Sequence, residues 1–128
     1  MDTETGFGLS TIGQIAIAVK NLDEQTAFYG DKLGMKLLFR VPNMTFFDGG
    51  GVRLMLSVPE SAEFDHPASI IYFKVADIHE AYEVLSKRGV KFERQPQLTA
   101  RMEKYDLWMA FLRDPENNVL GIMADVAT

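Results

Sequence analysis

The sequence predicts an α+β fold built from two similar modules, each with the order strand, helix and three further strands (βαβββ). Two observations support this. An alternating apolar segment followed by a capped helical segment occurs twice, and the spacing of matching residues is regular. In the 128-residue chain, Val75 lies 56 positions after Val19, and Asp114 lies 66 positions after Asp48. An internal repeat of this size indicates two copies of one structural unit.

The first module begins with residues 12–19, whose alternating apolar side chains are typical of a half-buried strand. Asn21 followed by Glu24 matches a capping box, so a helix is expected to begin there. Gly34 ends that helix. Three strands are then predicted at residues 36–41, 44–48 and 52–58, with the last two joined by a glycine turn.

The second module repeats this order with a strand at 69–75 and a helix capped by Asp77, with Glu80 three residues later. Gly89 ends the helix. Strands are predicted at 90–93, 107–112 and 119–126. The long segment 97–106 is expected to be a loop, either folding over a cleft or lying on the surface.

The length fits one domain. Its expected parts are a flexible tail at 1–10, a first module at 11–58, a polar linker at 59–68 and a second module at 69–126. Each module is too small to bury a sheet face alone, so the two are expected to pair.

The composition excludes several classes of protein. A net charge of −5 argues against nucleic acid, which needs a basic surface. No apolar run approaches the ~18 residues of a membrane helix. The acidic, polar N-terminus does not read as a secretory signal. The chain contains no cysteine, so neither disulfides nor thiolate chemistry are available. We therefore expect a cytoplasmic protein with neither nucleic-acid nor membrane partners.

Three segments carry a resemblance to a known superfamily: IAVKNLDEQTAFYGDKLGM, IYFKVADIHEAYEVLSKRGVKF and FLRDPENNVLGIM. The chain resembles the vicinal oxygen chelate superfamily, which includes glyoxalase I, bleomycin-resistance proteins and extradiol dioxygenases. The third segment is similar to an Asp-Pro-x-Gly-Asn pattern, with Asn117 in place of the usual glycine. The resemblance implies two βαβββ modules whose curled mixed sheet surrounds a cleft. It also implies a homodimer.

In metal-using members, the ligands come from the first and last strand of each module. Carried onto this chain, those positions are Gln14, Met55, Ile70 and Gly121. Gln14 could bind a metal, but a thioether suits hard cations poorly, and neither Ile70 nor Gly121 has a ligating side chain. We therefore expect no metal and no cofactor, and interpret Gln14 as a polar group that can hydrogen-bond a ligand in the cleft.

Strand alternation assigns the remaining cleft residues. Arg53 lies mid-strand and could anchor a carboxylate or phenolate, or it could form a salt bridge or lie at an exposed rim. Tyr72 could stack on a ligand, hydrogen-bond to it or donate a proton, or it could be core. Trp108 and Phe111 point to opposite faces, and the resemblance favours Phe111 in the cleft.

Two histidines and the 97–106 segment give weaker candidates. His79 lies in the first turn of a helix and is expected to be solvated, whereas His66 lies in the linker and could be a general base. Glu103, Tyr105 and Asp106 would contact a ligand if their segment covered the cleft.

The function expected is metal-independent binding of a small hydrophobic or aromatic ligand, which could be anionic, in the cleft between the modules. The expected ligand-binding residues are Gln14, Arg53, Met55, Ile70, Tyr72, Phe111, Gly121 and Met123. One alternative is an enzyme of the same superfamily, a lyase, isomerase or dioxygenase with a non-standard or metal-free active site. Another is an accessory module whose cleft is filled by its own side chains.

Overall fold

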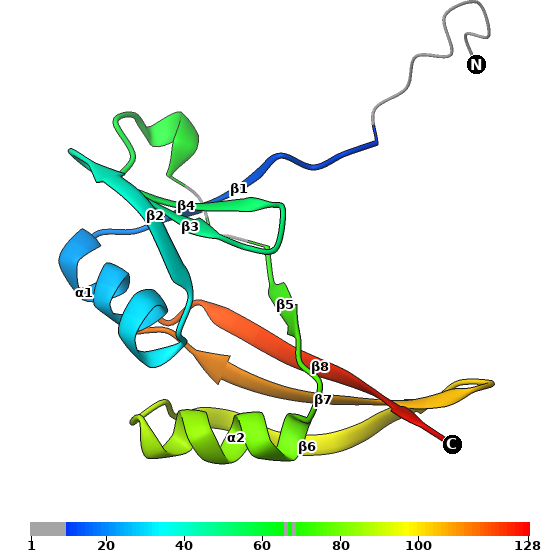
Figure 1. Cartoon of the computed structure of the whole chain (residues 1–128). Coiled ribbons are helices and arrows are strands. Elements are labelled where there is room, and N and C mark those ends of the chain that lie inside the picture. The colour runs from blue at the N-terminus through cyan, green and yellow to red at the C-terminus, as the bar shows by residue number, and fades with distance from the viewer. Residues whose placement is uncertain (1–9, 66, 68) are drawn as a thin grey trace, which may run out of the picture.

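The computed structural model describes residues 10–65, 67 and 69–128 (Figure 1). The first module contains β1 (Gln14–Ala18), α1 (Leu22–Ala27), the π-helix η1 (Phe28–Lys32), β2 (Lys36–Val41), β3 (Met44–Asp48) and β4 (Arg53–Ser57). A short 3-10 helix, η2 (Ala62–Phe64), follows. The second module contains β5 (Ile71–Lys74), α2 (Ile78–Lys87), β6 (Phe92–Arg101), β7 (Tyr105–Arg113) and β8 (Val119–Ala127). Of the expected tail at 1–10, residues 1–9 lie outside the described residues.

The strands form two four-stranded mixed sheets with equivalent topology. Their orders are β1-β4-β3-β2 and β5-β8-β7-β6. In each sheet the first and last strand of the module pair in parallel, and the other neighbours are antiparallel. This arrangement confirms the predicted α+β fold of two βαβββ modules.

The helix ends form where the sequence predicts them. The Asn21 side chain accepts a hydrogen bond from the Glu24 backbone N–H at 3.0 Å. The Asp77 side chain accepts from two backbone N–H groups in the first turn of α2. Gly34 and Gly89 follow the helices with φ of 77° and 90°, a conformation that glycine adopts without a Cβ clash.

Each helix covers one face of its own sheet (Figure 1). The hydrophobic core lies between the helices and the faces that they cover. In the first module this face carries Ile17, Leu56 and Phe47, packed against Tyr29. The second module contributes Leu120 and equivalent residues to the same continuous core. We call the opposite face of each sheet its open face. In Figure 1 both helices lie on the lower side of their sheets, so the two open faces do not face each other within one chain.

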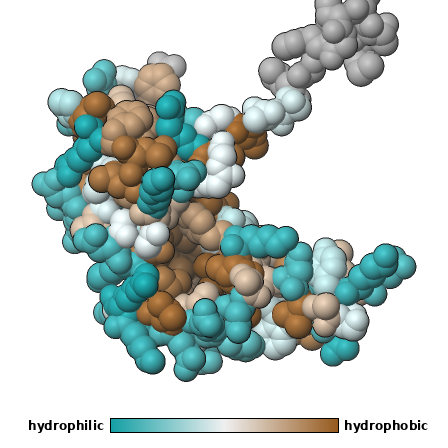
Figure 2. Space-filling model, viewed as in Figure 1, coloured by the Kyte–Doolittle hydropathy of each residue, from teal (hydrophilic) through white to brown (hydrophobic). Residues whose placement is uncertain are grey.

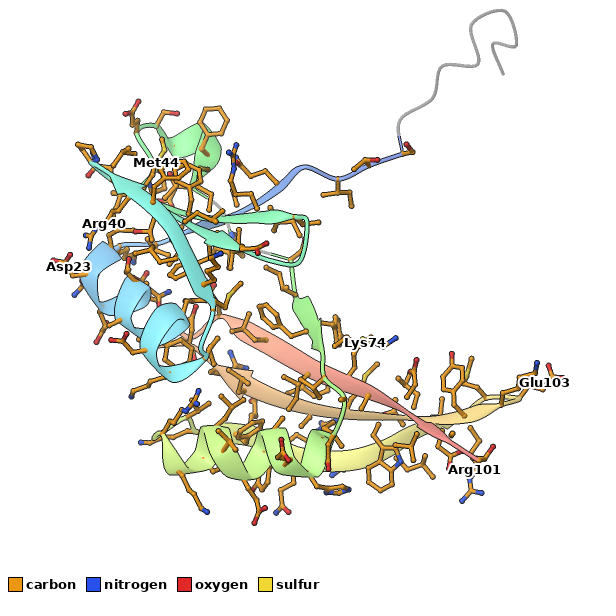
Figure 3. The ribbon with its side chains drawn as sticks, in the orientation of Figure 1. Asp23, Arg40, Met44, Lys74, Arg101 and Glu103 are labelled. Atoms are coloured by element: carbon orange, nitrogen blue, oxygen red, sulfur yellow. The ribbon has the colours of Figure 1, made fainter. Side chains whose placement is uncertain are left out.

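The segment 97–106 is not a loop, so that expectation is wrong. Strand β6 continues to Arg101, where Leu98 pairs with Trp108 and Arg101 pairs with Asp106. The tight turn between β6 and β7 is centred on Glu103, at the tip of a hairpin that projects away from the first module (Figure 3). Because β6 is an edge strand, it accommodates Pro96, which cannot donate to a sheet ladder.

A buried carboxylate joins the two modules. Asp114, in the turn after β7, accepts hydrogen bonds from Gln25 Nε2 at 2.9 Å and from the Tyr29 hydroxyl at 2.8 Å, both on the first module's helical segment. Burial, together with the charge of Asp114, raises the pKa of Tyr29 far above its ordinary value. Tyr29 therefore stays a neutral hydrogen-bond donor across the physiological pH range.

A second contact of the same turn fixes the start of α1. The Glu116 carboxylate accepts hydrogen bonds from the backbone N–H groups of Lys20, at 2.8 and 2.9 Å, and of Asn21, at 2.7 Å. These groups lie at the positive end of the helix, which favours a negative charge. Asn117, in the same turn, has φ of 72°, which explains why asparagine can stand where the related pattern has glycine.

In the described part of the chain, no helix is both long enough and apolar enough to cross a membrane.

Candidate functional site

Three predicted site residues lie together on the open face of the first sheet. Strands β1 and β4 pair in parallel, which places Gln14 beside Arg53 and Ala16 beside Met55. Arg53 Nε donates a hydrogen bond to Gln14 Oε1 at 2.9 Å. Gln14 Nε2 in turn approaches the Met55 sulfur at 3.7 Å. Gln14 therefore orients Arg53.

An aromatic stack lies under this arginine. The Arg53 guanidinium lies 5.1 Å from the centre of the Phe46 ring, within the range of a cation–π contact. Phe39 stacks on Phe46 with centroids 4.4 Å apart. Phe46 is buried, yet it is not part of the hydrophobic core, because it is covered on the open face rather than under the helix. Among the described residues, Arg53 has no acidic partner.

A cavity of about 540 Å³ adjoins these residues. Its floor is the β1–β3–β4 face, and one wall is the chain that follows β4, including η2. The lining includes Ala16, Ala18, Met44, Met55, Ser57 and Phe64. Apolar cavities of this size with a few polar groups are typical of small-molecule sites.

The open face of the second sheet carries Tyr72 directly over Gly121. A Cβ added to Gly121 would lie 2.6 Å from Tyr72 Cδ2 and 3.3 Å from Phe111 Cε1. The Tyr72 and Phe111 rings meet edge to face at 5.8 Å. The Arg94 guanidinium lies 6.0 Å from the Phe111 ring centre. This face therefore holds a second aromatic cluster beside an arginine.

The other predicted residues are distributed as follows. Ile70, just before β5, is exposed. Met123 and Met109 pair on the open face, whereas Trp108 packs against the core and against the His79 ring. Phe111, which contacts Tyr72, is therefore the open-face residue of this pair.

Five further residues remain to be placed, of which Lys74 lies at the end of β5. Lys74 forms a 3.5 Å ion pair with Asp125. Glu103, Tyr105 and Asp106 lie at or beside the tip of the β6–β7 hairpin, so they do not cover a cleft. His66 lies outside the described residues.

The positions that hold metal in the resembling proteins do not fit a metal in this chain. Gln14 is engaged with Arg53, and Met55 offers only a thioether. Ile70 has no donor atom, and the space beside Gly121 is filled by the Tyr72 ring. Across residues 10–65, 67 and 69–128, no group of three His, Cys, Asp or Glu side chains comes together.

The predicted residues form two sets rather than one within a chain. Gln14, Arg53 and Met55 belong to the first sheet. The others belong to the second sheet, except Ile70, which immediately precedes β5. Figure 2 shows a hollow between the two modules with hydrophobic side chains at its inner end. Figure 3 places Met44 on the far side of the first sheet from the second module, and Lys74 on the side of the hollow.

Several site residues were missed in the sequence. Met44 had a detectable signal, because the alternation of 44–48 places it on the same face as Phe46. No signal in the sequence marked Glu60 or Phe64, because they lie in the linker, where no periodicity predicts side-chain orientation. Phe39 follows a β-bulge, which shifts the register and hides its face from a simple count.

Comparison with known proteins agrees with this fold. A curated relative, the uncharacterized protein YraH of Bacillus subtilis (strain 168), is 27% identical over 123 residues, covering 85% of this chain and 94% of its own. The crystal structure of a glyoxalase/bleomycin resistance protein/dioxygenase from Alicyclobacillus acidocaldarius is 25% identical, with a TM-score of 0.71 over 90% of this chain and 91% of that one. A lactoylglutathione lyase from Agrobacterium tumefaciens is 21% identical, with a TM-score of 0.75 over 91% and 95%, which shows the fold alone.

The family match spans nearly the whole described structure. Residues 11–122 match the Glyoxalase/Bleomycin resistance protein/Dioxygenase superfamily. This match covers both modules, the Gln14–Arg53 pair and the Tyr72–Gly121 contact. The chain belongs to the glyoxalase/bleomycin resistance protein/dioxygenase superfamily.

Proposed function

We propose that this chain is a metal-independent binding protein for a small hydrophobic or aromatic ligand that could carry an anionic group. The observation that carries the proposal is Arg53, which has no acidic partner among the described residues and is held by Gln14 over the Phe46 ring. A planar guanidinium beside apolar surface suits a carboxylate or phenolate. The adjoining cavity of about 540 Å³ accommodates the apolar part of such a ligand.

We further propose that the chain works as a homodimer. The open faces expose large apolar side chains: Phe39, Val41, Ile70 and Tyr72. Each is a little under half exposed, so burying the remainder would contribute about 1 kcal/mol per side chain, which favours covering both faces. Since the two open faces do not face each other within one chain, a second copy can supply the face that each lacks. The cleft would then lie between one copy's first module and its partner's second module. A cytoplasmic location remains a prediction of the sequence.

The test separates binding from metal catalysis. The protein is purified without a histidine tag, and its metal content is measured by mass spectrometry before and after incubation with Zn²⁺, Ni²⁺, Mn²⁺ and Fe²⁺. A panel of aryl carboxylates is then screened by thermal shift against the chelated protein, with Arg53→Ala as the control. The proposal expects substoichiometric metal throughout and a stabilising carboxylate that has no effect on Arg53→Ala. One tightly held metal ion per chain, with turnover of a hemithioacetal or a catechol, would support the enzyme alternative instead.

A further inference from the structure

The cavity beside Met55 has a carboxylate of its own. Glu60 is among its lining residues, in the chain that follows β4. Among the described residues, Glu60 forms neither an ion pair nor a hydrogen bond. Two other acids of the first module are engaged: Asp23 pairs with Arg40, and Asp48 accepts from backbone N–H groups of the glycine turn, whereas neither Glu24 nor Asp31 lines this cavity. Glu60 is therefore a free negative charge at the rim of an apolar cavity.

The neighbours of Glu60 suit an ammonium group. Phe64, which also lines the cavity, is 66% exposed and presents an aromatic ring with little protein cover. A carboxylate and an aromatic face together attract a cation more strongly than either alone, because the ring quadrupole adds to the charge. Ser57, which also lines the cavity, adds a hydroxyl.

Arg53 lies at the other end of the same strip of sheet. Strand β4 runs from Arg53 through Met55 to Ser57, and these three residues share the open face because side chains alternate along a strand. At about 3.3 Å per residue, the strand separates Arg53 from Ser57 by about 13 Å. Between them the surface is apolar and low, because Ala16 and Ala18 stand beside Met55 and Ser57.

From this arrangement we infer that the ligand is bipolar, with an anionic group at Arg53, an apolar body over Ala16 and Met55, and a cationic group at Glu60. The inference rests on the proposed function, since it names the chemical class that the same face binds. An amino-substituted aryl carboxylate meets this description. A ligand with a single charge leaves one of the two free protein charges without a partner.

The experiment uses three probes on one skeleton: 4-(4-aminobutyl)benzoate, which has both charges; 4-butylbenzoate, which has the anion; and 4-phenylbutylamine, which has the cation. Binding to the full-length wild-type protein is measured by isothermal titration calorimetry in the presence of a chelator. The bipolar probe is expected to bind at least tenfold more tightly than either singly charged probe.

Two variants assign the charges. In Glu60→Gln, the affinity for the bipolar probe is expected to fall about tenfold, to that of 4-butylbenzoate, whose own affinity stays unchanged. In Arg53→Met, the bipolar probe is expected to bind no better than 4-phenylbutylamine. Asp65→Asn, which removes a nearby exposed carboxylate that does not line this cavity, is the matched control and is expected to leave all three affinities unchanged.

The results distinguish failure of this inference from failure of the proposed function. If 4-butylbenzoate binds through Arg53 while Glu60→Gln leaves the affinity for the bipolar probe unchanged, the ligand is not bipolar, and the proposed function stands. If 4-phenylbutylamine binds as tightly as the bipolar probe, the anionic half of the inference is wrong. If none of the three probes binds the wild-type protein, both proposals are overturned.

Discussion

The ring of Tyr72 occupies the space that any side chain at position 121 would need. An added Cβ on Gly121 would lie 2.6 Å from Tyr72 Cδ2 and 2.9 Å from Cε2, closer than real Cβ contacts allow. The resemblance to metal-using members of the superfamily implies a metal ligand at this position. The glycine and the tyrosine are therefore one feature, because the Tyr72 ring packs on a residue that has no side chain.

This contact predicts the effect of Gly121→Ala. The added methyl group should displace the Tyr72 ring, at a cost of about 1 kcal/mol in the free energy of unfolding. The cost should be modest because Tyr72 is 43% exposed and its ring can move outward. Urea denaturation measures it, and Gly13→Ala is the control, since an added Cβ there meets nothing within 4 Å. Equal free energies of unfolding for the two variants would show that the position of the Tyr72 ring does not require glycine at position 121.

Removal of the Glu116 carboxylate should loosen the junction between the modules. Glu116→Ala leaves the backbone N–H groups of Lys20 and Asn21 without their acceptor. Loss of such a helix-end contact costs about 1–2 kcal/mol. Chemical denaturation of this variant is compared with Glu83→Ala, which removes an exposed carboxylate from α2. Equal destabilisation of the two variants would contradict a junction role for Glu116.

The buried hydroxyl of Tyr29 should make stability fall in alkaline solution. Burial and the neighbouring Asp114 raise the pKa of Tyr29 in the folded protein, so the unfolded chain loses this proton first, near pH ~10. Below that pH the contribution to stability is fully present. Above it, the free energy of unfolding should fall by about 1.4 kcal/mol per pH unit from this group.

Tyr29→Phe provides the matching measurement. At neutral pH the variant should be less stable by about 1–2 kcal/mol, because Asp114 loses one of its donors while it stays buried. Above pH ~10 the difference between the variant and the wild type should shrink, since phenylalanine has no proton to lose. A difference that stays constant across the alkaline range would contradict the raised pKa.

The proposed homodimer predicts a mass of twice 14.4 kDa in light scattering coupled to size-exclusion chromatography. Phe39→Glu puts a charge on the open face of the first sheet, where it should convert the dimer to a monomer. Val84→Glu, at an exposed apolar position on α2, is the control and should leave the mass unchanged. A wild-type monomer would overturn the proposed assembly.

Local signals in the sequence predicted the helices and most of the strands, and the internal repeat predicted two modules. Asn21 and Asp77 cap helices through their own side chains, and strand alternation correctly separated Met55 and Tyr72 from the core residues. Such features depend on neighbours a few residues away, so a single sequence contains them.

Features set by distant partners could not be predicted. The strand at Gln97 forms because β7 pairs with it, although its own sequence is polar and contains a proline nearby. Asp114 becomes the junction between modules only because Gln25 and Tyr29 are brought to it by the fold. The Tyr72–Gly121 contact likewise requires two strands that meet in space.

The most direct test of metal-independent binding is isothermal titration calorimetry. In it, 4-butylbenzoate is titrated into the wild-type protein and into Arg53→Met, both in the presence of a chelator. We expect one binding event per chain in the wild type, unchanged by addition of Zn²⁺. We also expect at least a tenfold loss of affinity in Arg53→Met at unchanged stability, because Arg53 is exposed and its replacement leaves the core intact. Binding that appears only when metal is restored, or equal binding by the two proteins, would contradict metal-independent binding through Arg53.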